Sequence, residues 1–291
     1  MNIQKYRHPV LFYGLATAIP WVLWFTAAIL SHQTPVQQWH GTVGGILMVL
    51  GLFSPMVIAF YFMLSDPELK HDLFHRVFRF TAAKPVYLVI TLLLMPGSIL
   101  MAQAISLFFG YSTSQFAFAD SISFSYSLFP AWFMLFLAPL IEEMAWHSYG
   151  TDTLRARFSL FTTSVLFGLF WALWHFPLSF IKDYYHSNLV ETGWLYSMNF
   201  YFSLVPFVLI MNWLYYKTGR NIVVAIVFHI TAGVFNEIFA THPFSKLVQT
   251  VLLIGLAMFL IYRDRDFFFR KDYGESDTHN NNTLQAQEAV Q

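Results

Sequence analysis

Residues 141–150 read Ile-Glu-Glu-Met-Ala-Trp-His-Ser-Tyr-Gly, and residues 168–177 read Gly-Leu-Phe-Trp-Ala-Leu-Trp-His-Phe-Pro. The first block places adjacent carboxylates, Glu142 and Glu143, at the end of a long apolar run, and the second places His175 deep inside the next run. An ionisable side chain in a hydrocarbon layer costs about 2.5–3.5 kcal/mol on insertion scales. The two blocks therefore indicate membrane-spanning helices that carry a functional site.

The composition of the whole chain agrees with this reading. Of its 291 residues, 57% are hydrophobic and only 11% are charged, against roughly 25% charged in soluble domains. The formal net charge is zero, so no basic field favours nucleic acid. The chain has no cysteine, which excludes disulfides and thiol nucleophiles and leaves His, Asp, Glu and Asn as the possible metal ligands.

Eight apolar segments reach the length of about 20 residues that a bilayer-spanning helix needs. The predicted spans cover residues 10–30, 42–65, 87–109, 123–147, 160–181, 194–216, 221–240 and 244–262. Fourteen of the sixteen Lys and Arg residues lie in the N-terminus, the even-numbered connections and the tail, whereas Lys182 and Lys246 lie on the opposite side. By the positive-inside rule, the sequence predicts an all-α, polytopic integral membrane protein of about eight transmembrane helices with both termini cytoplasmic, in the cell membrane if the source is bacterial.

Three regions follow from this segmentation. Residues 1–122 hold the first three spans and an amphipathic cytoplasmic connection, residues 65–86, which we expect to lie along the membrane surface. Residues 123–262 hold the remaining spans and the unusual polar groups. Residues 263–291 form a polar tail, predicted to be disordered from residue 274.

The ionisable groups inside apolar runs lie on three helices of the second half. They are Glu142, Glu143 and His147 in the fourth span, His175 in the fifth, and His229 with Glu237 in the seventh. Glu237 lies near the outer end of its span and is expected to be interfacial. Helices that follow one another in the chain usually pack together, so these groups can converge on one site.

Helix geometry gives these residues different expected roles. Glu142 and Glu143 point about 100° apart, so one can face a site while the other braces a neighbouring helix. Glu143 and His147 are four residues apart and can pair on one helix face. Pro177 cannot donate a backbone hydrogen bond, so the fifth helix should bend or stop just beyond His175.

A carboxylate and two imidazoles in a site of low dielectric constant can activate water, with the carboxylate as base and a metal or imidazolium stabilising the oxyanion. Each group also has a plainer reading. Adjacent glutamates at the end of a span are more often interfacial caps, and a lone membrane histidine more often forms a hydrogen bond between helices. Their joint occurrence on three helices favours the hydrolytic reading.

The motifs Glu-Glu-x-x-Trp-His-x-Tyr and Gly-Leu-Phe-Trp-Ala-Leu-Trp-His-x-Pro resemble the signature of the CPBP family of intramembrane proteases. That family includes the CAAX prenyl endopeptidases of the Ras-converting type and bacteriocin-processing and immunity proteins. The resemblance runs from about residue 131 to residue 236. It implies a membrane endopeptidase that acts on lipidated or bacteriocin-like peptides.

The resemblance also implies roles for single residues. Glu142 is the expected water-activating base with Glu143 as its partner, and His175 and His229 are the expected metal ligands or oxyanion stabilisers. Glu142, His175 and His229 would hold zinc or another divalent metal, although a metal-free glutamate mechanism uses the same residues.

The family has three motifs, Glu-Glu-x-x-x-Arg, Phe-x-x-x-His and His-x-x-x-Asn, and the chain departs from them at three positions. His147 stands in place of an arginine, Trp171 in place of a phenylalanine and Gly233 in place of an asparagine. Asn236 lies on the same helical stripe as His229 and Gly233 and is a candidate for the missing amide.

Three functional hypotheses result. The first is an intramembrane endopeptidase, and the second is a catalytically inactive relative that acts as a membrane immunity or scaffold protein. A transporter fits less well, because the polar residues are confined to three helices and no pair of broken helices is visible.

Overall fold

The computed structural model describes residues 3–35, 37–78, 84–122 and 128–271. The predicted disorder from residue 274 lies outside this part of the chain. The longer helices are α1 (Pro9–Ser31), α2 (Gln38–Leu64), α4 (Pro85–Leu107), α5 (Ala131–Ala145), α7 (Leu160–Trp174), α9 (Trp194–Lys217), α10 (Ile222–Glu237) and α11 (Pro243–Arg263). The shorter elements are η1 (Ile3–Lys5), α3 (Pro67–Phe78), η2 (Thr113–Phe116), η3 (Trp146–Gly150), α6 (Thr151–Arg155), η4 (Phe176–Phe180), α8 (Tyr185–Thr192) and α12 (Arg265–Phe269).

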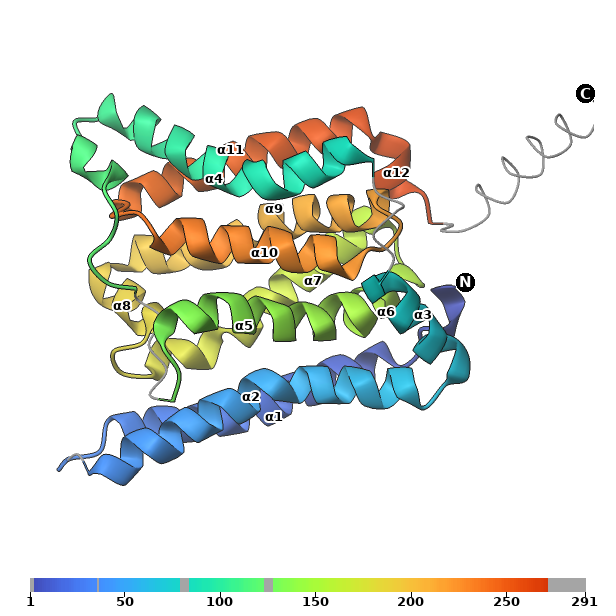
Figure 1. The fold of residues 1–291 in the computed structure, drawn as a ribbon, viewed down its shortest axis with the longest axis horizontal. Helices are drawn as coiled ribbons and strands as arrows, with labels where there is room; N and C mark the ends of the chain where they lie inside the picture. Colours follow the sequence, from blue (N-terminus) through green and yellow to red (C-terminus); the bar gives the residue numbers. More distant parts are fainter. Residues whose placement is uncertain (1–2, 36, 79–83, 123–127, 272–291) are drawn as a thin grey trace, which may run out of the picture.

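The eight longer helices of the described residues run side by side between two ends of an elongated bundle (Figure 1). One end carries η1, α3, α6 and α12, and we call it the α3 end. The other end carries α8 and the loop between α10 and α11, and we call it the α8 end. The chain passes from one end to the other in each long helix, as the alternation of charge in the connections predicts.

Six helical segments in the described residues are long and apolar enough to cross a bilayer, namely residues 9–31, 38–64, 85–107, 160–180, 194–217 and 243–263. The predicted seventh span is present as the shorter apolar helix α10. The predicted fourth span corresponds to α5, which has 15 residues. The chain is therefore an integral, multi-pass membrane protein of all-α architecture.

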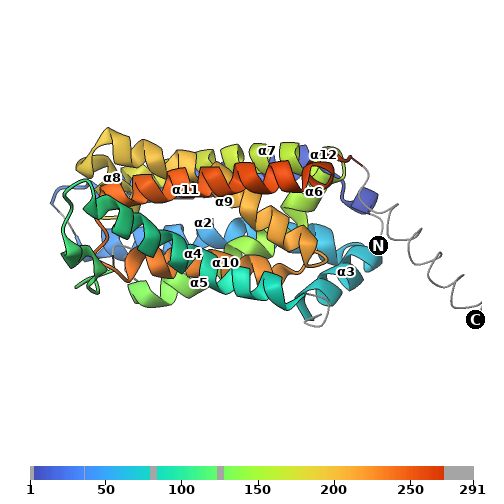
Figure 2. The ribbon, with the colours of Figure 1, turned by 90° about the horizontal axis from the view of Figure 1, so that it is seen from above.

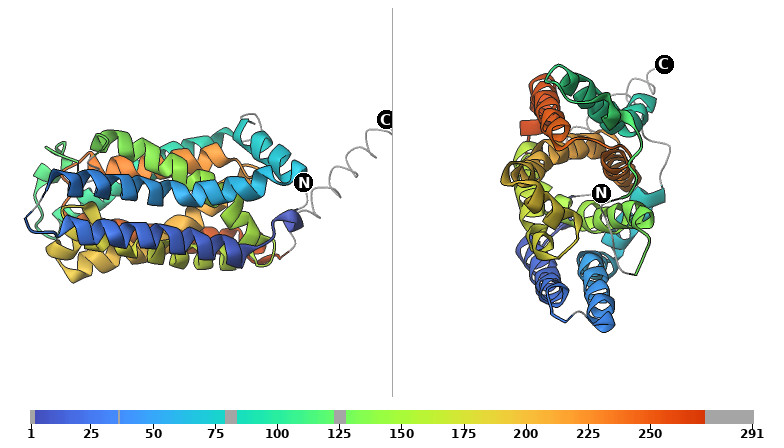
Figure 3. Two further views of the ribbon diagram at one scale, coloured as in Figure 1. Left: turned by 90° about the horizontal axis from the view of Figure 1, so that it is seen from below. Right: turned by 90° about the vertical axis from the view of Figure 1, so that its left-hand side faces the viewer.

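The helices form layers around an interior space. Seen from above, α7 and α11 lie along one side of the bundle and α5 and α10 along the other (Figure 2). Seen from the α8 end, α1 and α2 form a pair on one flank, while α4 and α11 lie on the opposite flank (Figure 3). Helix α9 packs on α7 and α11, and α10 packs on α4 and α5.

Proline and capping residues set several helix boundaries. Proline occupies the first position of α1, α3, α4 and α11, where its missing N–H costs nothing and its fixed φ suits the helix. Asn221 caps α10 by accepting the N–H of Val223 at 3.0 Å. Helix α7 ends at Trp174 and continues as the 3₁₀ helix η4, which contains Pro177. This break confirms the predicted stop just beyond His175.

The amphipathic connection is partly a helix, α3, at the α3 end (Figure 1). Leu69 and Leu73 are buried, while Phe74 and Phe78 are exposed. Unlike a purely interfacial helix, α3 also buries Asp72 and Arg76 against the rest of the protein.

Candidate active site

A cavity of about 390 Å³ lies inside the bundle, within the size range of small-molecule and cofactor pockets. Its walls come mainly from α5, α7, α8, α9, α10 and α11. The predicted site residues that line it are Glu142, Trp171, His175, His229, Gly233 and Asn236. The cavity extends to the α8 end, where the wall residue Thr192 is exposed.

Glu142 is buried in the cavity wall, at the C-terminal part of α5. Trp171 on α7 donates its indole N–H to Glu142 Oε2 at 2.9 Å. The Trp171 ring lies 5.0 Å from the His229 ring and 5.5 Å from the His175 ring, measured between centroids. One tryptophan thus contacts the carboxylate and both histidines, which brings the three helices α5, α7 and α10 together at one point.

Glu143 points away from the cavity and is completely buried. Its Oε1 lies 2.8 Å from Nδ1 of His229, and its Oε2 forms a short contact with Nδ1 of His147. The predicted pairing of Glu143 with His147 is therefore present. Glu143 braces His229 from behind, so the two adjacent glutamates have the different directions that helix geometry requires.

His147 is also completely buried. Its Nδ1 faces Glu143, and its Nε2 lies 2.9 Å from Oδ1 of Asn212, whose amide nitrogen donates to Ser164 Oγ at 2.9 Å. Both ring nitrogens of His147 thus contact oxygen atoms. His147 therefore joins Glu143 to Asn212 on α9 from the position at which the family pattern has an arginine.

The two cavity histidines are oriented through Nδ1. His175 caps the C-terminus of α7, and its Nδ1 lies 2.7 Å from the carbonyl oxygen of Trp171. Nδ1 of His229 is engaged by Glu143. In both rings Nε2 is the nitrogen left for a bound group. A histidine whose second nitrogen is fixed in this way has a defined tautomer and ring direction.

The motif that begins at His229 has Gly233 where the family pattern has an asparagine, and Asn236 lies nearby on the same helix. A Cβ atom at Gly233 would meet the Leu135 side chain at 3.8 Å, an ordinary contact. Asn236 lines the cavity, and its amide nitrogen donates to the carbonyl oxygen of Ala232 at 2.9 Å. The Asn236 amide thus bonds its own helix.

The position of Glu142 along the bundle differs from the prediction. The sequence places it near the cytoplasmic end of a span that stops at residue 147. In the structure the helical run continues through the π-helix η3 and through α6 to Arg155. The thirteen residues from Glu143 to Arg155 span about 20 Å at 1.5 Å per residue, so Glu142 lies deep in the bundle. His175 lies fifteen residues beyond the start of the predicted fifth span, which is also roughly 20 Å from the same end.

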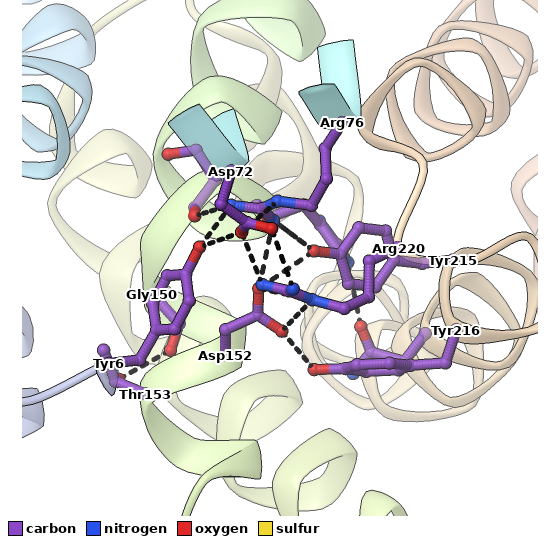
Figure 4. Close-up of polar contacts among 12 residues, drawn as sticks. Tyr6, Asp72, Arg76, Gly150, Asp152, Thr153, Tyr215, Tyr216 and Arg220 are labelled. Carbon is purple, nitrogen blue, oxygen red and sulfur yellow. Dashed lines mark hydrogen bonds and ion pairs between the residues drawn. The ribbon is translucent and has the colours of Figure 1, made fainter. Parts of the chain in front are cut away.

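A buried cluster of charges at the α3 end holds η3 in place (Figure 4). Arg76 donates to the carbonyl oxygens of His147 and Ser148 at 2.8 and 2.7 Å. A π-helix leaves such carbonyls without their usual i+4 partners. The sequence analysis did not single out Arg76, because an arginine in a charged connection resembles any other solvated cation.

The same cluster balances two cations against two carboxylates. Arg76 pairs with Asp72 at 2.8 Å and with Asp152 at 3.0 Å, and Arg220 pairs with the same two carboxylates at 3.0 and 2.5 Å. Burial alone would raise the pKa of Asp72, but the charges of Arg76 and Arg220 lower it below its ordinary value. The hydroxyl groups of Tyr6, Tyr215 and Tyr216 complete the hydrogen bonding.

The predicted metal ligands were tested for a coordinating arrangement. Among the described residues, no group of three or more His, Asp or Glu side chains is arranged to hold a metal ion. Glu142, His175 and His229 share a cavity wall without forming such a cluster.

Comparison with known proteins gives two findings. Residues 124–235 match the family described as type II CAAX prenyl endopeptidase Rce1-like. The chain is also 35% identical over 275 residues to the CAAX prenyl protease 2 of Methanococcus maripaludis. This alignment covers 92% of this chain and 99% of that protein. Residues 124–235, the part of the chain that matches the family, include every candidate site residue except Asn236, which lies one residue beyond this range.

Proposed function

Because this chain belongs to the type II CAAX prenyl endopeptidase family, we propose that it is an intramembrane endopeptidase in which Glu142 activates the attacking water. The observation that carries the proposal is the Trp171 junction, where the indole binds Glu142 and contacts both His175 and His229. A base and two imidazoles in the wall of one cavity are the groups that hydrolysis of an amide needs.

The proposed reaction begins with a water molecule between Glu142 and the scissile carbonyl. Glu142 accepts a proton from this water, and the oxygen attacks the carbonyl carbon. The His229 ring, as an imidazolium paired with Glu143 through Nδ1, donates from Nε2 to the oxyanion that forms. Nδ1 of His175 donates to the carbonyl oxygen of Trp171, so Nε2 of the neutral ring can accept a hydrogen bond from the water. Glu142 then passes its proton to the departing amide nitrogen.

The walls of the cavity favour a peptide that carries an apolar anchor. Leu52, Met95 and Leu253 contribute apolar surface, while Asn188 and Asn199 contribute amides toward the α8 end. An S-prenylated cysteine followed by a short peptide combines an apolar chain with peptide groups. The name of the Methanococcus relative, CAAX prenyl protease 2, refers to such prenyl substrates.

One observation favours a second function, that of an inactive relative which binds a membrane peptide without cleaving it. Gly233 offers no side chain at the position of the family asparagine, and the Asn236 amide is bonded to Ala232. In such a protein the oxyanion would lack one of its hydrogen-bond donors, and the cavity would bind the peptide without hydrolysing it.

A cleavage experiment separates the two functions. Purified protein in lipid nanodiscs is incubated with an S-farnesyl peptide ending in Cys-Val-Ile-Met, and released tripeptide is measured by mass spectrometry with and without a chelator. Release of Val-Ile-Met supports the endopeptidase. Binding of the peptide without release by folded protein supports the inactive relative. Loss of cleavage with chelator, restored by zinc, would assign the predicted metal to the reaction.

A further inference from the structure

His186 is a buried histidine that none of the three family motifs contains. It is the second residue of α8 and is only 4% exposed. It lines the same cavity as Glu142, His175 and His229. Within the described part of the chain, neither of its ring nitrogens has a hydrogen-bond partner.

The surroundings of His186 hold the ring firmly. It stacks on the His175 ring with centroids 5.3 Å apart and an interplanar angle of 22°. Phe200 meets it edge-on at 4.6 Å, and Tyr184 stacks on it at 5.5 Å. An aromatic ring is therefore well packed at this position, but nothing in this packing requires the ring to carry nitrogen.

The missing partners have an energetic consequence. A buried polar group left without a hydrogen bond destabilises the folded protein, and buried polar groups in native proteins are nearly always paired. Phenylalanine would give the same aromatic contacts without this cost. The imidazole at position 186 is consequently best explained by a partner that enters the cavity.

We propose that His186 binds the main chain of the substrate peptide and positions it against His175. This inference rests on the proposed function and adds a substrate-binding residue to it. A neutral imidazole offers one N–H donor and one nitrogen acceptor, which match the C=O and N–H groups of a peptide. Because His186 stacks directly on His175, a peptide bound there lies beside the reacting groups.

The test compares His186→Phe with His186→Gln. The phenylalanine variant keeps the aromatic packing and removes both nitrogens, whereas the glutamine variant keeps a donor and an acceptor. Binding is measured in the Glu142→Gln background, so that no cleavage intervenes, with the S-farnesyl peptide ending in Cys-Val-Ile-Met as the probe. We expect His186→Phe to weaken binding of the peptide at least tenfold. His186→Gln should weaken the same binding less than fivefold. In cleavage by otherwise unchanged protein, His186→Phe should raise KM far more than it lowers kcat.

Thermal unfolding provides a readout that does not depend on the substrate. The His186→Phe protein should unfold at the same or a higher temperature than its parent, because the unpartnered nitrogens are gone. Equal binding and cleavage by His186→Phe and its parent would overturn the inference, and so would a marked loss of stability. If the unchanged protein binds the probe but never cleaves it, the proposed function fails while the binding comparison still decides the role of His186. If the probe does not bind at all, both are overturned.

Discussion

Replacing Arg76 with methionine removes one of two cations from a buried cluster that also holds two carboxylates. Arg76, Asp72, Asp152 and Arg220 are each at most 6% exposed. After the replacement, Arg220 alone faces both carboxylates. The carbonyl oxygen of Ser148 loses the Arg76 donor, while that of His147 keeps only the Tyr215 hydroxyl. Breaking a buried ion pair by removing one partner costs about 3–5 kcal/mol. We expect Arg76→Met to lower the free energy of unfolding by that amount.

Two further variants test the cause of this loss. Arg76→Lys keeps the charge but not the planar fork that reaches several oxygens at once, and we expect it to cost about 1–3 kcal/mol. In the double variant Arg76→Met/Asp72→Asn, the remaining Arg220 and Asp152 balance one another. This double variant should therefore be less destabilised than the sum of the two single variants, with a coupling of about 1–3 kcal/mol.

The assay is equilibrium unfolding by SDS in mixed micelles, followed by the fluorescence of the nine tryptophans. Lys5→Met is the matched control, because it removes a cation from an exposed pair, Lys5 with Glu68. Exposed pairs contribute about 0–1 kcal/mol. A loss below about 1 kcal/mol for Arg76→Met, or strict additivity in the double variant, would refute the view that this cluster is held by balanced buried charge.

Three more predictions concern the third motif, acid stability and orientation. Gly233→Asn should fold normally, since its Cβ meets only an ordinary contact, and should increase peptide cleavage severalfold; a lower rate would argue against an amide role at this position. Because the pKa of Asp72 lies below its ordinary value of 3.8, its contribution to stability is present above that pH and is lost as the pH falls below it. Unfolding midpoints between pH 7 and pH 3 should therefore fall less steeply for Asp72→Asn, and parallel curves would contradict this assignment. Since the chain has no cysteine, Thr192→Cys at the α8 end should react with a membrane-impermeant maleimide on intact cells, whereas Lys70→Cys at the α3 end should react only after permeabilisation; the reverse pattern would place the termini outside.

Much of the fold follows from the sequence, because long apolar runs and uneven Lys and Arg content constrain membrane helices strongly. The break after His175 was predictable from Pro177 alone. The end of the fourth helix was not, because it continues through a π-helix whose carbonyls are satisfied by Arg76, a residue 71 positions before His147. Apolar periodicity carries no information about such a distant donor.

The candidate site, like the fold, was predictable from the sequence only in part. Motif spacing correctly indicated that Glu143 pairs with His147, since this contact lies within one helix. It did not link Asn212, an amide inside an apolar run, or His186 to the site, which these residues reach from α9 and α8. His186 in particular lies in a polar connection, where a histidine is ordinarily exposed. Only the packing of α8 over the cavity reveals that it is buried beside His175.

The central claim is that Glu142 activates water, and the ratio of cleavage rates between two glutamine variants tests it most directly. Glu142→Gln keeps the shape of the side chain and removes the base. Glu237→Gln makes the same change at another buried carboxylate in the wall of the same cavity, one that pairs with Lys246. With the S-farnesyl peptide in nanodiscs, we expect Glu142→Gln to lower kcat at least a hundredfold, within the range of about 10²–10⁴ for general base catalysis, and Glu237→Gln to stay within a few-fold of the unchanged protein. Equal rates for the two variants would contradict the account.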